Sequence, residues 1–235
     1  MYKNSPWTRV AQMKHVTFFS DDLAAGRRRG SAAPEGYEAL PIADGNIDLK
    51  QLFLPDPKAS QLLGKLLAKI DWQQDKIRLF GKTHLLPRLH QWYGDEGTAY
   101  RWSGIQMHPR PWIRDLMALR YAVEQDTGAR FNCVLINLYR DGRDSMGWHA
   151  DDEAVLGPCP AIASISLGAE RDLLLRRRGA LRASHAISLR HGSLLLMRGE
   201  TQRNWQHALP RRKKVLTPRI NLTFRYIEPA DNAPQ

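Results

Sequence analysis

The sequence has little cysteine and no long apolar segment. Its 235 residues include two cysteines, Cys133 and Cys159, and neither belongs to a C-x-x-C pair. Two such thiols cannot hold together a disulfide-rich secreted scaffold. No apolar run approaches the roughly 18 residues that a membrane-spanning helix needs, and the first residues do not resemble a signal peptide. We therefore expect no membrane attachment and a cytoplasmic location, nucleoid-associated in a prokaryote or nuclear in a eukaryote.

Several common nucleotide-binding and hydrolase motifs are also absent. Gly81-Lys82-Thr83 is like the end of a phosphate-binding loop, but that motif needs a glycine where this chain has Lys76. Neither a G-x-S-x-G elbow nor a G-x-G-x-x-G turn occurs. The P-loop ATPases, the common α/β-hydrolases and the dinucleotide-binding enzymes are therefore excluded.

Positive charge is in excess. Lysine and arginine total 35 against 24 acidic residues, a net charge of +11, while the 43% hydrophobic content is ordinary for a globular protein. Such a field attracts polyanions such as nucleic acid. Two clusters concentrate the charge, Arg176-Arg177-Arg178 and Arg211-Arg212-Lys213-Lys214. Each pattern alone is more typical of a solvated surface, so the charge by itself leaves nucleic-acid binding open.

The apolar pattern predicts an α+β protein that is mostly β. Asp56 and Pro57 are expected to be the N-cap and first turn of a helix whose leucines follow at helical spacing. A second helix is expected from Pro109–Pro111 to Gly128. The segment Asp21–Glu38 predicts a flexible basic arm. Short β-rich runs follow Ala129, which favours a barrel or jelly roll with helices packed outside. The expected strands are Phe131–Tyr139, Ile162–Leu167, Asp172–Arg177, Ala186–Leu189, Ser193–Met197 and Arg219–Ile227.

One histidine–carboxylate pair could bind a metal. On extended backbone, His149 and Asp151 point to the same face. Such a pair alone is more often a surface feature. His207 lies 58 positions later, a separation that an antiparallel sandwich can close. Two imidazoles and one carboxylate form the facial triad of non-haem Fe(II) oxygenases.

The strand near the carboxyl end has a polar face. Strict alternation predicts that Arg219, Asn221, Thr223 and Arg225 share one face, with apolar residues on the other. The ordinary interpretation is a solvent-facing edge strand. Beside an iron, however, an inward arginine suits the distal carboxylate of 2-oxoglutarate. Asn137 and Tyr139, two positions apart on an earlier strand, would face the same cavity.

The sequence resembles the AlkB family of Fe(II)/2-oxoglutarate dioxygenases, which repair alkylated nucleic-acid bases. The resemblance is carried by four features in this order along the chain: N-x-Y, H-x-D, a distant histidine and R-x-N-x-T-x-R. The similarity extends over about residues 50 to 228. Further segments resemble the branch that acts on duplex DNA: Leu79-Phe80-Gly81-Lys82, Pro87-Arg88, Tyr100-Arg101-Trp102-Ser103-Gly104, Asp151-Asp152-Glu153 and Arg212-Lys213-Lys214-Val215-Leu216.

The resemblance implies a double-stranded β-helix, or jelly roll, with flanking N-terminal helices and a nucleotide-recognition lid. It divides the chain into a partly flexible arm (1–48), a helix plus lid (49–108), a catalytic jelly-roll core (109–228) and a tail (229–235).

It also implies the site residues and their ligands, which are Fe(II), 2-oxoglutarate and O₂. Iron would be held by His149, Asp151 and His207. 2-Oxoglutarate would be held by Asn137, Tyr139, Arg219, Asn221, Thr223 and Arg225. Substrate contacts would come from Leu79, Phe80, Gly81, Arg88, Tyr100, Arg101, Trp102 and Asp152. The branch usually has phenylalanine in place of Trp102.

The implied activity is oxidative demethylation of N-alkylated bases in DNA, with release of formaldehyde and succinate. The expected partner is duplex DNA with a flipped base, bound by a monomer. Phe80 is expected to fill the gap left by that base; the alternative is a phenylalanine packed within a hairpin. Two other functions stay open, an oxygenase acting on RNA or protein and an inactive nucleic-acid-binding module. The complete triad argues against the inactive module.

Overall fold

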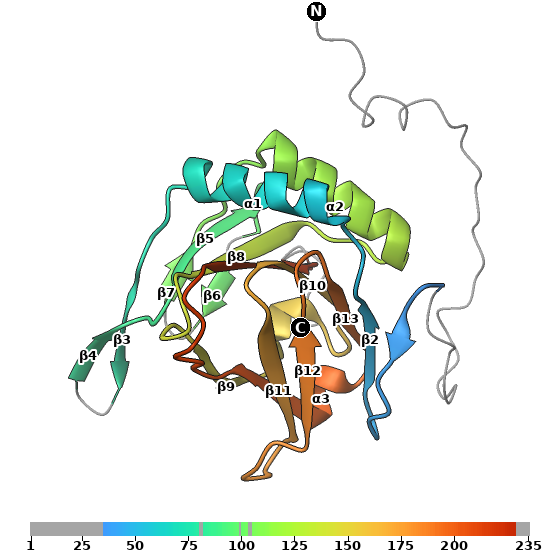
Figure 1. The fold of residues 1–235 in the computed structure, drawn as a ribbon. Helices are drawn as coiled ribbons and strands as arrows, with labels where there is room; N and C mark the ends of the chain where they lie inside the picture. The colour runs from blue at the N-terminus through green and yellow to red at the C-terminus, as the bar shows by residue number, and fades with distance from the viewer. Residues whose placement is uncertain (1–34, 80–81, 99, 103–104, 229–235) are drawn as a thin grey trace, which may run out of the picture. The chain divides into compact units, whose positions relative to one another are not determined.

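The fold is given by a computed structural model, which describes residues 35–79, 82–98, 100–102 and 105–228. Most of the arm predicted over Asp21–Glu38 lies outside these residues. The described chain forms two antiparallel sheets that face each other, with helices on one side (Figure 1). The prediction of a mostly β, jelly-roll type of α+β fold is confirmed. No described helix is long and apolar enough to cross a membrane.

The larger sheet has seven strands in the order β1-β2-β13-β10-β15-β8-β5. The strands are β1 (Glu38–Ala39), β2 (Asn46–Lys50), β5 (Leu89–Gly94), β8 (Cys133–Tyr139), β10 (Ile162–Gly168), β13 (Leu194–Arg198) and β15 (Arg219–Arg225). Because β15 lies between β10 and β8, it is a central strand. The solvent-facing edge strand considered from the sequence is therefore wrong.

The smaller sheet has four strands in the order β12-β11-β14-β9. They are β9 (Met146–His149), β11 (Arg171–Arg177), β12 (His185–Leu189) and β14 (Trp205–Leu209). A short helix, α3 (Thr201–Asn204), leads into β14, and a 3-10 turn, Ala154–Leu156, follows β9. One apolar cluster fills part of the space between the sheets, with Trp92, Leu175 and Leu195 among its buried members.

Two helices cover the outer face of the larger sheet (Figure 1). They are α1 (Asp56–Lys69) and α2 (Arg114–Thr127), and the Lys65–Asp115 ion pair joins them. Gly128 ends α2 as expected, because its φ of 69° is one that glycine adopts without strain. Asp56, expected as the N-cap of α1, is instead in its first turn, where a carboxylate stabilises the helix dipole.

Alternation along the central strands sends apolar side chains to the helices and polar ones inward. Ile220, Leu222 and Phe224 of β15 are fully buried in the cluster beneath α1 and α2. The intervening polar residues of the same strand therefore face the smaller sheet. This parity places the predicted co-substrate residues in the interior of the sandwich.

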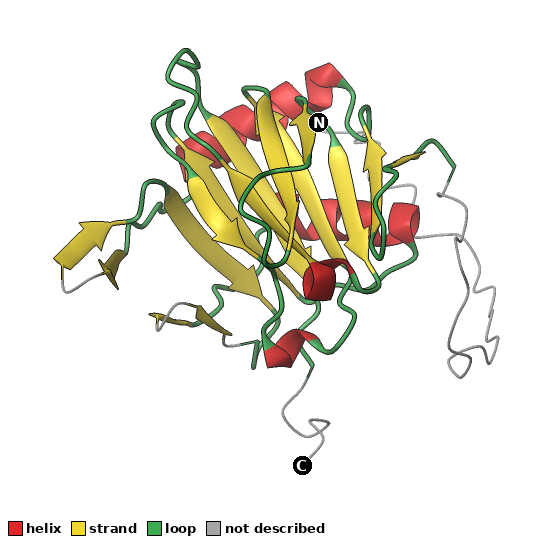
Figure 2. Ribbon diagram, turned by 90° about the horizontal axis from the view of Figure 1, so that it is seen from below, coloured by secondary structure: helices red, strands yellow, loops and turns green. Residues whose placement is uncertain are grey.

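Two hairpins form separate two-stranded sheets. They are β3 (Lys76–Leu79) with β4 (Lys82–Leu85), and β6 (Tyr100–Trp102) with β7 (Ile105–Met107). Figure 1 shows β3 and β4 projecting away from the sandwich, and Figure 2 shows both hairpins on one side of it. These hairpins coincide with the region predicted to be the lid.

Two predicted segment boundaries need correction. The boundary after residue 48 cuts through β2, which pairs with β13 in the larger sheet. The segment 49–108 contains β5, which pairs with β8 in the same sheet. Both segments therefore contribute strands to the catalytic sandwich. The sequence pattern missed β2, β5, β9 and β14. The last three mix polar and aromatic residues without a clear alternation, and the alternation in β2 covers only five residues.

Candidate metal centre and co-substrate cavity

A small cavity lies between the two sheets. Its other lining residues are mainly apolar and include Leu135, Leu173 and Leu195. All nine residues predicted to hold iron or 2-oxoglutarate line it: His149, Asp151, His207, Asn137, Tyr139, Arg219, Asn221, Thr223 and Arg225. The structure thus brings together residues that span most of the second half of the chain.

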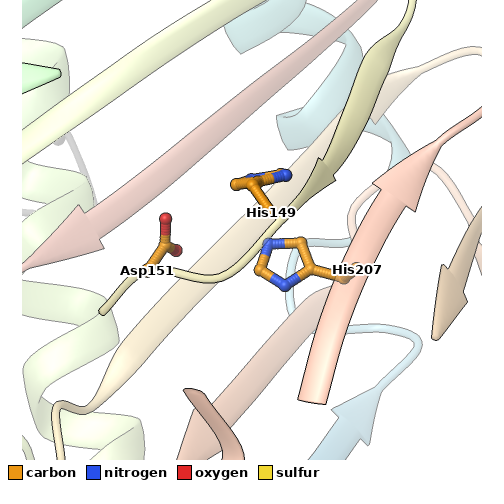
Figure 3. A group of neighbouring side chains, drawn as sticks. All are labelled: His149, Asp151 and His207. Atoms are coloured by element: carbon orange, nitrogen blue, oxygen red, sulfur yellow. The ribbon is translucent and has the colours of Figure 1, made fainter. Parts of the chain in front are cut away.

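The three candidate iron ligands converge at this cavity (Figure 3). His149 on β9 and His207 on β14 are direct strand partners, with ring centroids 4.2 Å apart, and Asp151 follows β9. One ligand atom from each residue lies within 4.8 Å of the others. Nδ1 of His149 is 2.9 Å from the Gly147 carbonyl, which fixes Nδ1 as the donor and leaves Nε2 as the ligand atom. This donor set fits Fe(II).

Asp151 is ionised in its buried position by the charges around it. Arg225 donates to its Oδ1 over 2.7 Å, and both side chains are about 5% exposed. Burial alone raises the pKa of Asp151, but the positive charge of Arg225, with smaller effects of the two nearby histidines, outweighs burial and lowers the pKa to about 2. Gln202 Oε1 accepts the Asp151 backbone N–H at 2.9 Å. No sequence motif pointed to Gln202.

Arg219 lies at the other end of the polar face of β15. Its Nη2 donates to Ser166 Oγ (2.9 Å) and Asn221 Oδ1 (2.8 Å), and its Cζ is 5.4 Å from the Tyr139 ring centroid. Burial lowers its pKa to about 10, so it stays charged at neutral pH. Its buried Nε has no hydrogen-bond partner among the described residues. An unsatisfied guanidinium N–H in a cavity suits a carboxylate ligand.

The two arginines of β15 serve different ends of the cavity. Arg219 and Arg225 are six residues apart on an extended strand, so their Cα atoms are separated by roughly 20 Å. Arg225 is bonded to the iron-ligand candidate Asp151, whereas Arg219 is surrounded by Tyr139, Ser166 and Asn221. The family resemblance assigned both arginines to 2-oxoglutarate without distinguishing them.

The predicted substrate contacts are less uniform. Arg88 is 3% exposed and donates from Nε to Asn137 Oδ1 at 3.0 Å, so it supports a co-substrate residue from behind. The expected contact between Arg88 and the substrate stays a prediction. Asp152 is half-exposed and accepts from Arg178 over 2.5 Å. Leu79 is in β3, Tyr100, Arg101 and Trp102 form β6, and Phe80 and Gly81 lie outside the described residues.

The two basic clusters also differ. In the first cluster, Arg177 pairs with Asp44 at 2.8 Å, and the Cζ of Arg176 is 4.4 Å from the Trp148 ring centroid. Arg178 pairs with Asp152, so each arginine of this cluster has a contact within the protein. The residues from Arg211 to Lys214 are all exposed, and among them Arg212 pairs with Asp172 at 3.1 Å. The second cluster is therefore the better candidate for phosphate contacts.

We expect the metal-free protein to lose stability on mild acidification because of His207. Burial and the neighbouring charge of His149 lower its pKa from 6.5 to about 3, so folded His207 stays neutral where the unfolded chain binds a proton. The unfolding free energy should therefore fall as the pH drops below 6.5. The measurement is the free energy of unfolding in urea at pH 7 and pH 5. Between these two pH values, it should fall by about 2 kcal/mol more in wild type than in His207→Asn. Equal pH dependence in both proteins would mean that His207 is accessible to protons.

Comparisons with known proteins identify the family. The model of the 2OG-Fe(II) oxygenase superfamily matches residues 47–225. DNA oxidative demethylase ALKBH2 of Bos taurus is 46% identical over 88% of this chain and 74% of its own. ALKBH2 of Homo sapiens is also 46% identical, over 65% of this chain, and the match spans 61% of the human protein's length.

Two further comparisons agree in family and fold. Alpha-ketoglutarate-dependent dioxygenase alkB homolog 3 of Mus musculus is 38% identical over 85% of this chain and 70% of its own. The solved structure of OsALKBH1 covers 80% of this chain and all of its own, with a TM-score of 0.56 and 16% identity. The latter shows the fold alone. The chain belongs to the 2OG-Fe(II) oxygenase superfamily and, within it, to the AlkB family, whose chemistry uses Fe(II), 2-oxoglutarate and O₂.

Proposed function

We propose that this protein is a DNA oxidative demethylase that removes alkyl groups from base nitrogens. The observation that carries the proposal is the cluster that the partly exposed His149 forms with the buried Asp151 and His207. It shares one cavity with the polar face of β15, in a chain similar to ALKBH2 over most of its length.

The proposed chemistry is a coupled oxidation. Fe(II) with 2-oxoglutarate and O₂ supplies it: 2-oxoglutarate becomes succinate and CO₂, and one oxygen atom enters a C–H bond of the alkyl group. The resulting hydroxymethyl group leaves the base nitrogen as formaldehyde. On the protein side, Arg225 holds Asp151 ionised and oriented, while Arg219 is placed for the distal carboxylate. The apolar lining restricts water.

A substrate panel tests the proposal against its alternatives. Succinate and formaldehyde would be measured with one N-methylated base presented in duplex DNA, single-stranded DNA, RNA and free nucleoside. We expect formaldehyde release that depends on DNA. Higher turnover with RNA would move the protein to the RNA-oxygenase alternative. Binding of DNA without succinate formation in any arm would support the inactive binding module.

We further propose that the preferred substrate is duplex DNA with the damaged base flipped out. The supporting features are the β3–β4 hairpin, which projects from the sandwich, and the exposed basic segment from Arg211 to Lys214 (Figure 1). A flipped base leaves a gap that costs a few kcal/mol of stacking. Phe80 lies between β3 and β4 in the sequence and is our candidate to fill that gap.

Phe80→Ala should reduce repair in duplex DNA by about ten- to hundredfold, because loss of a stacking side chain costs roughly 1 to 3 kcal/mol. Single-stranded DNA has no gap to fill, so repair of the same lesion there should persist. The measurement is the formaldehyde release rate on the two substrates, together with the melting temperature.

Leu85→Ala is a matched control, because Leu85 is a 55% exposed apolar residue on β4 of the same hairpin. It should leave both rates near wild type. If Phe80 instead packs within the hairpin, both substrates would lose activity alike and the melting temperature would drop.

A further inference from the structure

We propose that Arg171 is a positioning residue that holds the iron-ligand strands and the co-substrate side of the cavity in register. Arg171 begins β11 and is 2% exposed, and it does not line the cavity. The inference rests on the proposed assignment of the iron and 2-oxoglutarate residues. It assigns a role to a residue that no motif indicated.

The guanidinium of Arg171 binds the backbone of two separate loops. Its Nη2 donates to the Asp144 carbonyl at 3.0 Å and to the Pro210 carbonyl at 2.6 Å, and its Nη1 donates to the Asp141 carbonyl at 3.3 Å. Charged donors bound to buried carbonyls form strong, directional hydrogen bonds. One side chain therefore bridges the two loops.

Each of these loops adjoins a strand that carries an iron-ligand candidate. The loop containing Asp141 and Asp144 runs from β8 into β9, which ends at His149. Pro210 directly follows β14, which carries His207. Since β9 and β14 are paired at these two histidines, a shift of either loop changes the position of one imidazole relative to the other.

The two loops also contact each other directly, and the contact is tight. Gly142 N–H donates to the Val215 carbonyl (2.8 Å), and Arg212 N–H donates to the Gly142 carbonyl (2.7 Å). A Cβ atom added at Gly142 would lie 1.7 Å from the Arg212 carbonyl oxygen. The position of Arg171 is therefore closely constrained by the backbone of both loops.

Arg171 also adjoins the co-substrate residues. Its Cζ is 6.0 Å from the Tyr139 ring centroid, and the Cζ of Arg219 is 5.4 Å from the same ring. Tyr139 and Arg219 are strand partners on β8 and β15. A planar guanidinium against the Tyr139 ring restricts where the phenol can lie. Loss of Arg171 should thus disturb metal and 2-oxoglutarate binding together.

The test compares Arg171→Gln and Arg171→Lys with wild type in two equilibrium measurements. Calorimetry would give the affinity of the metal-free protein for Mn(II), used as a redox-stable probe of the iron site. It would then give the affinity of the Mn(II)-loaded protein for 2-oxoglutarate. We expect Arg171→Gln to weaken both by about tenfold or more, as does loss of other supporting groups around metal ligands. Lysine should recover part of the loss, because it has the charge but not the planar fork.

Arg198→Gln is the matched control for stability. Arg198 on β13 is half-buried and pairs with Asp48 on β2. It does not line the cavity. It should lower the melting temperature and leave both affinities unchanged. If Arg171→Gln also changes only the melting temperature, Arg171 is purely structural and the proposal fails. Should Arg171→Gln not fold, wild-type affinities in Arg171→Lys would overturn it equally.

A second control separates this inference from the site assignment on which it rests. His207→Ala should lose Mn(II) binding whatever the role of Arg171. Retained binding in that variant would remove the assigned metal site itself. If His207→Ala loses Mn(II) binding as expected and Arg171→Gln keeps both wild-type affinities, only the positioning role of Arg171 is rejected.

Discussion

Replacing His207 with alanine is expected to abolish 2-oxoglutarate turnover while leaving the protein folded. His207 is one of three groups whose ligand atoms lie within 4.8 Å of one another, and two ligands hold Fe(II) poorly. The loss should exceed the roughly 10- to 100-fold effect of removing an outer hydrogen-bond partner. Succinate formation and Mn(II) affinity are the two measurements, and both should fall together. The same loss of function is expected for His149→Ala.

The Asp151→Ala variant should behave differently from the histidine variants. Asp151 is also the partner of Arg225, and both side chains are about 5% exposed. Its removal breaks this buried ion pair, which costs roughly 3 to 5 kcal/mol of stability. We therefore expect loss of metal binding together with a lower melting temperature. A melting temperature equal to that of wild type would mean that the Asp151–Arg225 ion pair contributes little to stability.

A histidine outside the cavity provides the control for this set. The ring of His191 accepts the Gly168 N–H at 2.8 Å and contacts Ser60, away from the three ligand candidates. His191→Gln should keep wild-type Mn(II) affinity and turnover. Turnover near wild type in any ligand variant would reassign that ligand.

Arg219→Ala is expected to raise the required 2-oxoglutarate concentration at least about 30-fold. The variant loses a charge-assisted pair in a closed site, worth roughly 2 to 5 kcal/mol. Arg219→Lys should recover only part of this, since a point charge lacks the planar fork that matches a carboxylate. The measurement is 2-oxoglutarate affinity in the Mn(II)-loaded protein, followed by the 2-oxoglutarate dependence of succinate formation.

Arg225→Ala provides the contrast that tests the division of roles along β15. Because Arg225 bonds Asp151, its loss should weaken Mn(II) binding first, whereas Arg219→Ala should leave Mn(II) binding close to wild type. If both variants changed 2-oxoglutarate affinity alone and to the same extent, the two arginines would share one ligand. Unchanged 2-oxoglutarate affinity in Arg219→Ala would place the distal carboxylate elsewhere.

The local pattern of the sequence was sufficient to find the helices, most central strands and the grouping of chemistry-bearing residues. Alternation along Arg219–Arg225 correctly placed four polar side chains on one face, because side-chain direction in a strand depends only on parity. Family resemblance selected His149, Asp151 and His207, which the fold then brought within ligand distance. These properties are short-range or are encoded in motif spacing, so they can be read without coordinates.

Tertiary structure alone decided which face is interior and which residue contacts which. Parity cannot distinguish a solvent-facing strand from a central one; the pairing of β15 with both β10 and β8 does. In the same way, Arg88 turned out to support Asn137, and Arg225 to bind Asp151. The three carbonyl partners of Arg171 lie in the loops after β8 and β14, which only the tertiary structure brings together. Such contacts join residues far apart in the chain and depend on strand register and loop packing, which no local window of sequence contains.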